Sequence, residues 1–290
     1  MKTLFNRFPI KSEFTKNALT LTVGTSISQA FPMIFYPILG RIFEPADFGL
    51  LAILTSITSI LTVLATAKYE SSILITDTKK DAANIISLVL LLSFSFLLVS
   101  SIIIQILSNQ FSVWFNEPEL KRWIFICPIS AFAIIIFNCY NEWCVRNKYF
   151  ISLSWNKIIN SVANTLSKLL FGFVKIVSNG LVLGELTGRL ISAGVCIYRA
   201  LQQDRKVLFQ ISFKRIGYLA KRYIRFPRYL LPDQLLDTVN SQLSTLMIAT
   251  FFMSSEVGYY MMARTLLSLP ASVIALAMRD VFRQRANEEW

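Results

Sequence analysis

Residues Ile85–Leu107 read IISLVLLLSFSFLLVSSIIIQIL, a run of 23 residues that contains no charge. A helix needs about 20 apolar residues to cross the ~30 Å hydrocarbon core of a bilayer. Ala18–Gly40 is a second uncharged run of 23 residues, and Leu50–Ala67 adds 18 more. Runs of this length are typical of membrane spans rather than of soluble cores. We therefore predict an all-α chain that crosses the membrane several times.

The composition of the whole chain agrees with this fold class. Of its 290 residues, 54% are hydrophobic and 16% are charged, and the mean hydropathy is +0.54. Soluble domains average roughly 25% charged residues. Weaker apolar runs extend the prediction to a polytopic transmembrane helix bundle of about eight helices. We place the spans at 17–40, 48–70, 83–107, 123–144, 152–176, 179–199, 228–252 and 257–279.

The basic residues predict the orientation of these spans. Of the 29 Lys and Arg residues, 20 fall on the side of the N-terminus, four on the opposite side and five within spans. Cytoplasmic loops carry the excess of Lys and Arg in multi-spanning proteins. We therefore predict that both termini of this chain are cytoplasmic. Topology accounts for the net charge of +12, so the charge does not call for a nucleic-acid partner.

A basic segment at 201–227 divides the chain. Within Val207–Phe226 the apolar residues recur at spacings of three and four, and five Lys and Arg residues lie between them. This pattern predicts an amphipathic helix on the cytoplasmic leaflet; a solvated linker held by anionic lipid is the alternative. On either side we predict a six-helix lobe at 1–200 and the first two helices of an incomplete second lobe at 228–290.

Several kinds of chemistry have no residues to support them. The chain has no histidine, so a His base, a Ser-His-Asp triad and a His-ligated metal are excluded. Its four cysteines fall within spans without CxxC spacing, and no P-loop or GxGxxG motif is present. We predict no cofactor and no metal, and we expect a protein that is not an enzyme.

Charged residues deep within the spans are the first candidates for a functional site. Such residues are costly in lipid and usually face a bundle interior or a wet cavity. Lys168, Arg189 and Arg264 lie deep enough to be expected in a substrate cavity, where their positive charge would attract phosphate or acidic sugars. Glu185 precedes Arg189 by four residues, a spacing that suits an ion pair within one helix.

Two further sets of polar residues share helical faces. Asp233 and Asp237 are four residues apart in one span, and we predict a role in ion coupling, with neutralisation by Arg264 as the alternative. Thr22, Ser26 and Gln29 form a stripe in the first span, which Pro32 and Pro37 follow (the prolines can bend or break a helix). We predict that this stripe lines a cavity; helix–helix packing through small polar residues is the alternative.

The chain also contains a short internal repeat. Residues 46–52 (ADFGLLA) and 255–261 (SEVGYYM) each carry an acid, an apolar residue and then glycine at the start of a span. The two copies are 209 residues apart and occupy the same place in the topology, between the first and second helices of a block. Repeated bundles of parallel orientation are a known transporter design.

At this point the sequence resembles a family. Residues 36–49 (YPILGRIFEPADFG), the turn at 146–150 (RNKYF), and 258–260 (GYY) with 269–270 (LP) are similar to bacterial polysaccharide repeat-unit flippases. These are the O-antigen and capsule translocases of the multidrug/oligosaccharidyl-lipid/polysaccharide exporter superfamily. The family has no fixed binding motif to transfer.

The resemblance implies a fold and a function. The fold is two six-helix lobes around a central cavity, working by alternating access in the bacterial inner membrane. The substrate would be an undecaprenyl-diphosphate-linked oligosaccharide, moved from the cytoplasmic to the periplasmic leaflet. The partners would be membrane lipids and, in addition, the polysaccharide polymerase and chain-length machinery.

Two other readings of the sequence stay open. One is a multidrug or lipid exporter of the same fold. The other is a membrane enzyme that polymerises or transfers lipid-linked sugars, for which Glu117 and Glu119 are the acidic candidates in the outer loop. The 209-residue repeat further predicts a complete transporter of about 420 residues or more, so we expect this chain to be incomplete.

Overall fold

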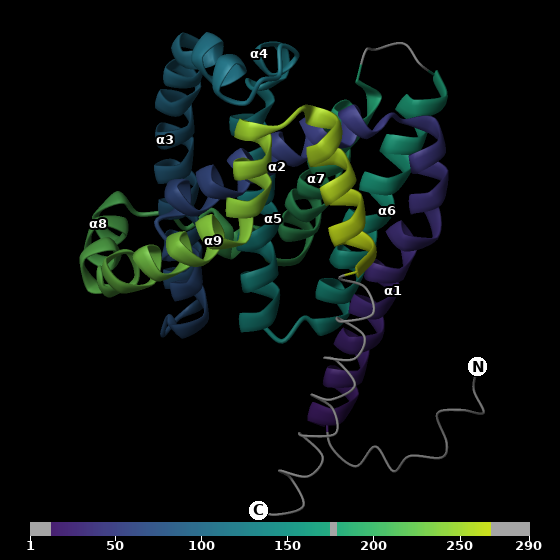
Figure 1. The fold of residues 1–290 in the computed structure, drawn as a ribbon. Coiled ribbons are helices and arrows are strands. Elements are labelled where there is room, and N and C mark those ends of the chain that lie inside the picture. The colour runs from purple at the N-terminus through teal and green to yellow at the C-terminus, as the bar shows by residue number, and fades with distance from the viewer. Residues whose placement is uncertain (1–12, 175–178, 268–290) are drawn as a thin grey trace, which may run out of the picture.

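The computed structural model describes residues 13–174 and 179–267, which form a bundle of helices with no β-strand in these ranges (Figure 1). Seven long helices account for most of it. They are α1 Glu13–Ile42, α2 Pro45–Thr66, α3 Lys79–Trp114, α5 Ile126–Arg146, α6 Phe150–Val174, α7 Gly180–Leu208 and α9 Leu231–Phe251. The shorter elements are η2 Tyr69–Ile75, α4 Leu120–Trp123, α8 Phe213–Arg222 and η3 Phe226–Leu230, and residues 254–267 are also helical.

The predicted fold class is confirmed. Each of the eight predicted spans corresponds to a helix, although 175–176 and 268–279 lie outside the described residues. Four helices, α2, α3, α5 and α7, are long and apolar enough to cross a membrane. Among the described residues, α1, α6 and α9 do not belong to this group. The amide, hydroxyl and lysine side chains of α6 explain its low hydropathy, and they line the cavity described below.

The second span ends earlier than its sequence predicts. Ala67 and Lys68 both have a positive φ, 46° and 59°, which stops α2 at Thr66. The chain then turns into η2, where Lys68 Nζ lies 3.6 Å from Glu70 Oε1. The prediction that residues 67–70 continue the helix is wrong, because left-handed residues cannot extend a right-handed helix.

The boundaries of two helix pairs repeat with one offset. Helix α1 ends at Ile42 and α2 begins at Pro45, while α9 ends at Phe251 and the next helix begins at residue 254. Both boundaries differ by 209 residues, the offset of the sequence repeat. The offset of the sequence repeat thus recurs at the junctions of the two helix pairs.

The two pairs meet through reciprocal glycine contacts. A side chain at Gly49 would overlap the backbone carbonyl of Ser254, and one at Gly258 would overlap the carbonyl of Pro45. Positions 45 and 254 differ by 209, and so do 49 and 258, so each contact is the equivalent of the other. Contacts exchanged in this way are the mark of a two-fold relation. The helix pairs are thus related by an approximate two-fold axis that passes between Gly49 and Gly258.

A row of glycines brings α6 and α7 into backbone contact. Gly180, Gly184 and Gly188 follow one another at every fourth position of α7. Added side chains would collide with Phe171, Lys168 and Asn164 of α6, in that order. Small residues at this spacing allow membrane helices to approach closely. Helix α1 packs on the other side of α6, where Gly24 lies against Ser154.

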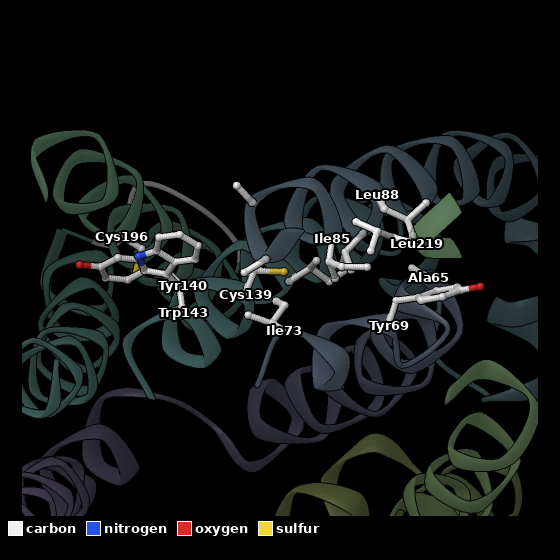
Figure 2. Close-up of a cluster of buried hydrophobic side chains, with 14 of the residues drawn as sticks. Ala65, Tyr69, Ile73, Ile85, Leu88, Cys139, Tyr140, Trp143, Cys196 and Leu219 are labelled. Atoms are coloured by element: carbon white, nitrogen blue, oxygen red, sulfur yellow. The ribbon is translucent and has the colours of Figure 1, made fainter. Parts of the chain in front are cut away.

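Helix α8 exists and packs against protein, while its predicted position on the cytoplasmic leaflet stays a prediction. It spans 213–222 instead of most of 207–226. Its apolar residues Ile216 and Leu219, with Tyr223 directly after it, are 7%, 0% and 7% exposed. Figure 2 shows Leu219 beside Leu88 and Ile85 of α3, within a core cluster that also contains Tyr69. The amphipathic pattern was correct, but the surface that receives its apolar face is the first lobe.

Ion pairs hold α8 in this position. The Arg215 guanidinium donates from Nε to Asp81 Oδ1 at 2.7 Å and from Nη2 to Asp81 Oδ2 at 2.9 Å. Arg222 Nη2 lies 2.8 Å from Asp77 Oδ2. Bidentate pairs of this kind fix orientation as well as distance. Much of the basic segment that sequence reasoning set apart is therefore packed with the first lobe.

Candidate functional site

A polar cavity of about 340 Å³ lies among α1, α5, α6 and α7. Helix α6 supplies most of its lining: Lys157, Asn160, Ser161, Asn164, Thr165 and Lys168. The remaining polar groups come from Ser28 of α1 and Glu185 of α7. From Lys157 to Lys168 the helix rises by about 16 Å, at 1.5 Å per residue. The cavity therefore extends along about half of a membrane-spanning helix.

Helical periodicity gathers these side chains on one face of α6. Residues 157, 161 and 165 form one row and residues 160, 164 and 168 form the next, because positions four apart lie one above the other. Hydrogen bonds connect the face to its neighbours. Lys157 Nζ donates to Thr25 Oγ1 at 3.0 Å, and Asn164 Nδ2 donates to the backbone oxygen and to Oδ1 of Asn160 at 2.8 and 3.1 Å.

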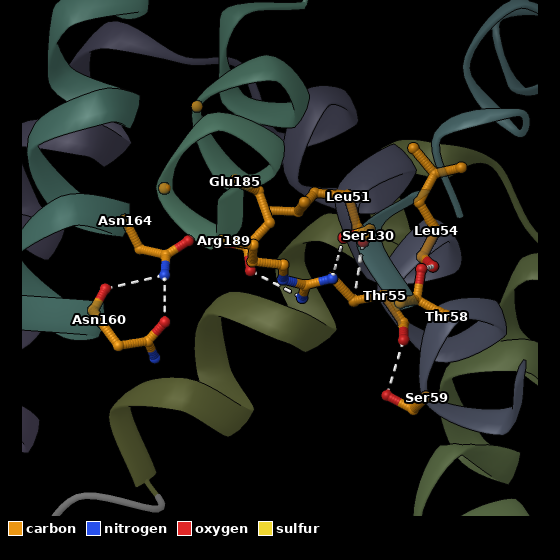
Figure 3. Close-up of polar contacts among 12 residues, drawn as sticks. Leu51, Leu54, Thr55, Thr58, Ser59, Ser130, Asn160, Asn164, Glu185 and Arg189 are labelled. Carbon is orange, nitrogen blue, oxygen red and sulfur yellow. Dashed lines mark hydrogen bonds and ion pairs between the residues drawn. The ribbon is translucent and has the colours of Figure 1, made fainter. Parts of the chain in front are cut away.

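A trio of charges closes one end of the cavity. Lys168 Nζ lies 2.5 Å from Glu185 Oε2, and Arg189 Nη2 lies 2.7 Å from Glu185 Oε1. The predicted pair of Glu185 and Arg189 is confirmed, and Lys168 joins it from the neighbouring helix. Arg189 Nη1 also contacts Ser130 Oγ of α5 at 2.6 Å (Figure 3). All three charged side chains are less than 20% exposed, so the trio is held within the bundle.

A second polar hollow of about 360 Å³ lies between α2, α9 and the 254–267 helix. Arg264 lines it, together with Thr55, Ser56, Gln242 and Thr245. Ser56 Oγ donates to Gln242 Oε1 at 3.0 Å across the two blocks. The structure therefore places Arg264 in a different hollow from Lys168 and Arg189. Thr55 lines both this hollow and a small space of about 10 Å³ beside Arg189.

The predicted stripe on α1, Thr22, Ser26 and Gln29, does not line this cavity. Thr22 is half-buried, and Ser26 and Gln29 are exposed in the described part of the chain. The cavity instead receives Ser28 and Pro32. Ser161 Oγ donates to the backbone oxygen of Ser28 at 2.5 Å, which fixes this side of α1 against α6.

The two acids of α9 are separate from the charged trio. Asp233 and Asp237 are exposed, and Gln234 Nε2 donates to Asp237 Oδ2 at 3.1 Å. Within the described residues the structure gives neither acid an ion pair, so the predicted neutralisation by Arg264 is absent from this arrangement. Their role in ion coupling stays a prediction.

Other candidates from the sequence have local roles. Glu119 Oε2 accepts from Trp123 Nε1 at 3.2 Å, and Glu117 Oε1 accepts from the backbone N–H of Glu119 at 3.2 Å, so both acids stabilise the turn before α4. All four cysteines are free and buried. A third space of about 220 Å³, between α3, α5 and α7, is lined mainly by apolar side chains and lacks the polar groups of the cavity.

Sequence reasoning missed the amides of the cavity. Asn160 and Asn164 precede Lys168 at intervals of four. This spacing alone could have drawn attention to α6 as a polar wall. What the spacing could not give is the partner helix, because contact with Glu185 depends on the register of α6 against the glycines of α7.

Comparison with known proteins identifies the family of the chain. A family model described as "Polysaccharide biosynthesis protein" matches residues 38–283, well over half of the chain. No curated protein and no solved structure matches it. The matched range contains the α6 wall of the cavity, the charged trio and the reciprocal glycine contacts. The chain therefore belongs to the polysaccharide biosynthesis protein family.

Proposed function

We propose that the protein transports lipid-linked oligosaccharide repeat units, carried on undecaprenyl diphosphate, across the bacterial inner membrane. The observation that carries this proposal is the polar cavity among α1, α5, α6 and α7. Amide and hydroxyl groups suit the hydroxyl groups of sugars, since both donate and accept hydrogen bonds. Ligand pockets commonly measure about 300–1,000 Å³, and the cavity of about 340 Å³ falls in this range. It accommodates part of a sugar chain rather than the whole substrate.

The charges of the cavity suit the other end of the substrate. Lys157 and Lys168 line the space, and Arg189 lies directly behind Glu185. An ammonium or guanidinium group beside a phosphate forms a charge-assisted hydrogen bond. The proposed site thus combines groups for neutral sugars with groups for a diphosphate. Membrane lipids and the polymerase and chain-length machinery are the proposed partners.

The paired helix blocks support alternating access as the mechanism. Transporters built from repeated bundles expose a central site to one side and then to the other by movement of one bundle against its equivalent. In this chain the approximate two-fold axis passes between Gly49 and Gly258, at the contact of the two helix pairs. This arrangement would allow the second block to move against the first lobe, which contains the cavity.

Complementation tests the proposed function. The complete reading frame is expressed in a bacterial strain that lacks its own repeat-unit flippase, and surface polysaccharide is measured. Restored polysaccharide supports the proposal. Drug resistance without polysaccharide would favour a multidrug exporter, and polymerised sugar on the cytoplasmic side would favour an enzyme.

Cavity variants connect the result to the site. Asn160→Leu and Asn164→Leu should each lower export about three- to tenfold, because a hydrogen bond is worth about 0.5–1.5 kcal/mol. Asn109→Leu is the matched control, since Asn109 is exposed near the end of α3 and outside the cavity lining. Membrane levels of all three variants are measured by immunoblot. Equal export by the cavity variants and the control would show that the cavity is not the substrate-binding site.

A further inference from the structure

Lys168 and Arg189, the two cations of the charged trio, could bind a phosphate group only in competition with Glu185. Each carboxylate oxygen of Glu185 already contacts one cation, with Lys168 at 2.5 Å and Arg189 at 2.7 Å. An anion that approaches Lys168 or Arg189 therefore meets a cation that already has a counter-ion. The sum of the three charges is +1, compared with +2 for the two cations alone.

We infer that Glu185 is a resident counter-ion, which the phosphate group of the substrate must displace from Lys168. This inference rests on the proposed function and names the group that decides which anions bind. A carboxylate that competes for the same ammonium sets the minimum strength with which an anion must attract Lys168. A diphosphate, with its higher charge, exceeds this minimum, and a singly charged sugar acid does not.

The positions of the three side chains decide which contact is exchanged. Lys168 and Glu185 line the cavity, whereas Arg189 lies behind Glu185 and contacts Ser130. Of the two cations that Glu185 contacts, an anion in the cavity therefore reaches Lys168 first. Glu185 then keeps its contact with Arg189, which is four residues along the same helix. Exchange of one partner therefore leaves no carboxylate alone in the bundle.

Close packing supports exchange of the side chain rather than movement of the helices. The Cα of Lys168 lies against Gly184, which directly precedes Glu185. The backbones of α6 and α7 are thus fixed relative to each other at this point. The four-carbon stem of lysine is flexible, whereas the guanidinium of arginine is planar and rigid. Lys168 is the group that can turn from Glu185 toward an incoming phosphate.

Substitution of Glu185 separates a counter-ion from a purely structural group. Glu185→Gln leaves two buried cations without a carboxylate, which destabilises the empty protein. An anion in the cavity would replace the missing charge. The variant should therefore unfold at a lower temperature than the wild type without ligand, and it should bind the anion more tightly.

The experiment uses the purified complete protein in detergent, with inorganic pyrophosphate as the probe at constant ionic strength. Thermal unfolding is followed as pyrophosphate is titrated. Glu185→Gln should show an apparent Kd at least about tenfold lower than the wild type, and it should also respond to glucuronate, which should give no response with the wild type. The control Glu119→Gln should behave as the wild type, because Glu119 belongs to the turn before α4.

A double variant keeps the test valid if Glu185→Gln does not fold. Lys168→Gln with Glu185→Gln removes one charge of each sign, so it should regain stability while losing the response to pyrophosphate. Repeating the wild-type titration in bilayer discs with and without phosphatidylglycerol distinguishes the two sources of phosphate. A pyrophosphate response that phosphatidylglycerol abolishes would assign the site to membrane lipid and overturn the inference.

Equal affinity of wild type and Glu185→Gln for pyrophosphate would also overturn it. A response that survives in the double variant would do the same, because the anion would then be bound elsewhere. Export by the wild type in complementation, together with equal affinities, would reject this inference alone. Failure of the wild type to export would reject the proposed function.

Discussion

Gly258 occupies in the second helix pair the position that Gly49 occupies in the first, and each lies against the backbone of the residue that begins the other pair's second helix. The two contacts have no space for a side chain. They bring the start of α2 and the start of the 254–267 helix together at one point. The two blocks can therefore approach this closely only because glycine has a hydrogen atom where other residues have a side chain.

Alanine at either glycine should weaken this contact. Gly49→Ala and Gly258→Ala each force a backbone carbonyl to move, and we expect a loss of about 1–3 kcal/mol of stability for overpacking of this kind. The measurement is thermal or denaturant unfolding of the purified protein. The double variant should cost less than the sum of the single variants, because one separation of the helices relieves both collisions.

The control for the glycine pair is Gly194→Ala. Gly194 lies in α7 with no atom within 4 Å of an added side-chain carbon. Alanine should be neutral or slightly stabilising there, since it favours the helix over glycine. Equal effects at Gly194 and Gly49 would show that the reciprocal contact is not what the variants disturb.

The second prediction concerns the attachment of α8. Arg215→Gln should increase hydrogen exchange of the amides in 213–222, because it removes the bidentate pair with Asp81. A double-mutant cycle with Asp81→Asn should show a favourable but small coupling, since solvent screens an exposed arginine. Arg225→Gln is the control, as the structure gives Arg225 no ion pair within the described residues. Unchanged exchange in Arg215→Gln would mean that the buried apolar face alone holds α8.

The third prediction tests the topology. Single cysteines at Lys80, Lys121 and Arg205 are labelled in intact cells with a reagent that does not cross membranes. The charge distribution predicts labelling at 121 only. The four native cysteines are buried and should not react. Labelling at 205 before the cells are opened would contradict a cytoplasmic basic segment.

The fourth prediction concerns Asp233 and Asp237. Replacement of both by Asn should abolish the dependence of export on the proton or sodium gradient, because a neutral side chain cannot carry the charge. Export is measured in vesicles with and without an imposed gradient. The control is Glu256→Gln, an exposed acid of the next helix. Gradient dependence that persists in the double variant would leave the two acids a role in the structure only.

The helices were predictable from the sequence because the pattern that predicts each helix lies within its own residues. Uncharged runs such as Ile85–Leu107 require no partner to be recognised, and the pair of Glu185 and Arg189 lies on one helix. The end of α2 was not predictable in this way, because the left-handed turn at Ala67 and Lys68 involves residues that usually continue a helix. The position of α8 on α3 was hidden for a related reason, since an amphipathic face fits protein as well as lipid.

The cavity was only partly predictable. Lys168 could be named from its depth in a span, but not its contact with Glu185, because that contact depends on how two helices are aligned. The α1 stripe was placed on a neighbouring side of the helix, since the hydroxyl pattern says nothing about which side meets α6. Which faces of two helices meet, and in what register, depends on contacts between the helices. The glycines of α7 are the one part of these contacts that the sequence pattern indicates.

The attachment of α8 also determines where the protein can bend. Because Arg215, Leu219 and the buried Tyr223 fix α8 and the residue after it to the first lobe, the covalent link to α9 runs from Ile224 to Leu230. Within it, Phe226–Leu230 is a π-helix, a wider turn that is rarely used in regular structure and is often found at functional sites. Any rotation of one block against the other would have to be absorbed by these few residues, so the length of this segment would limit the size of the rotation.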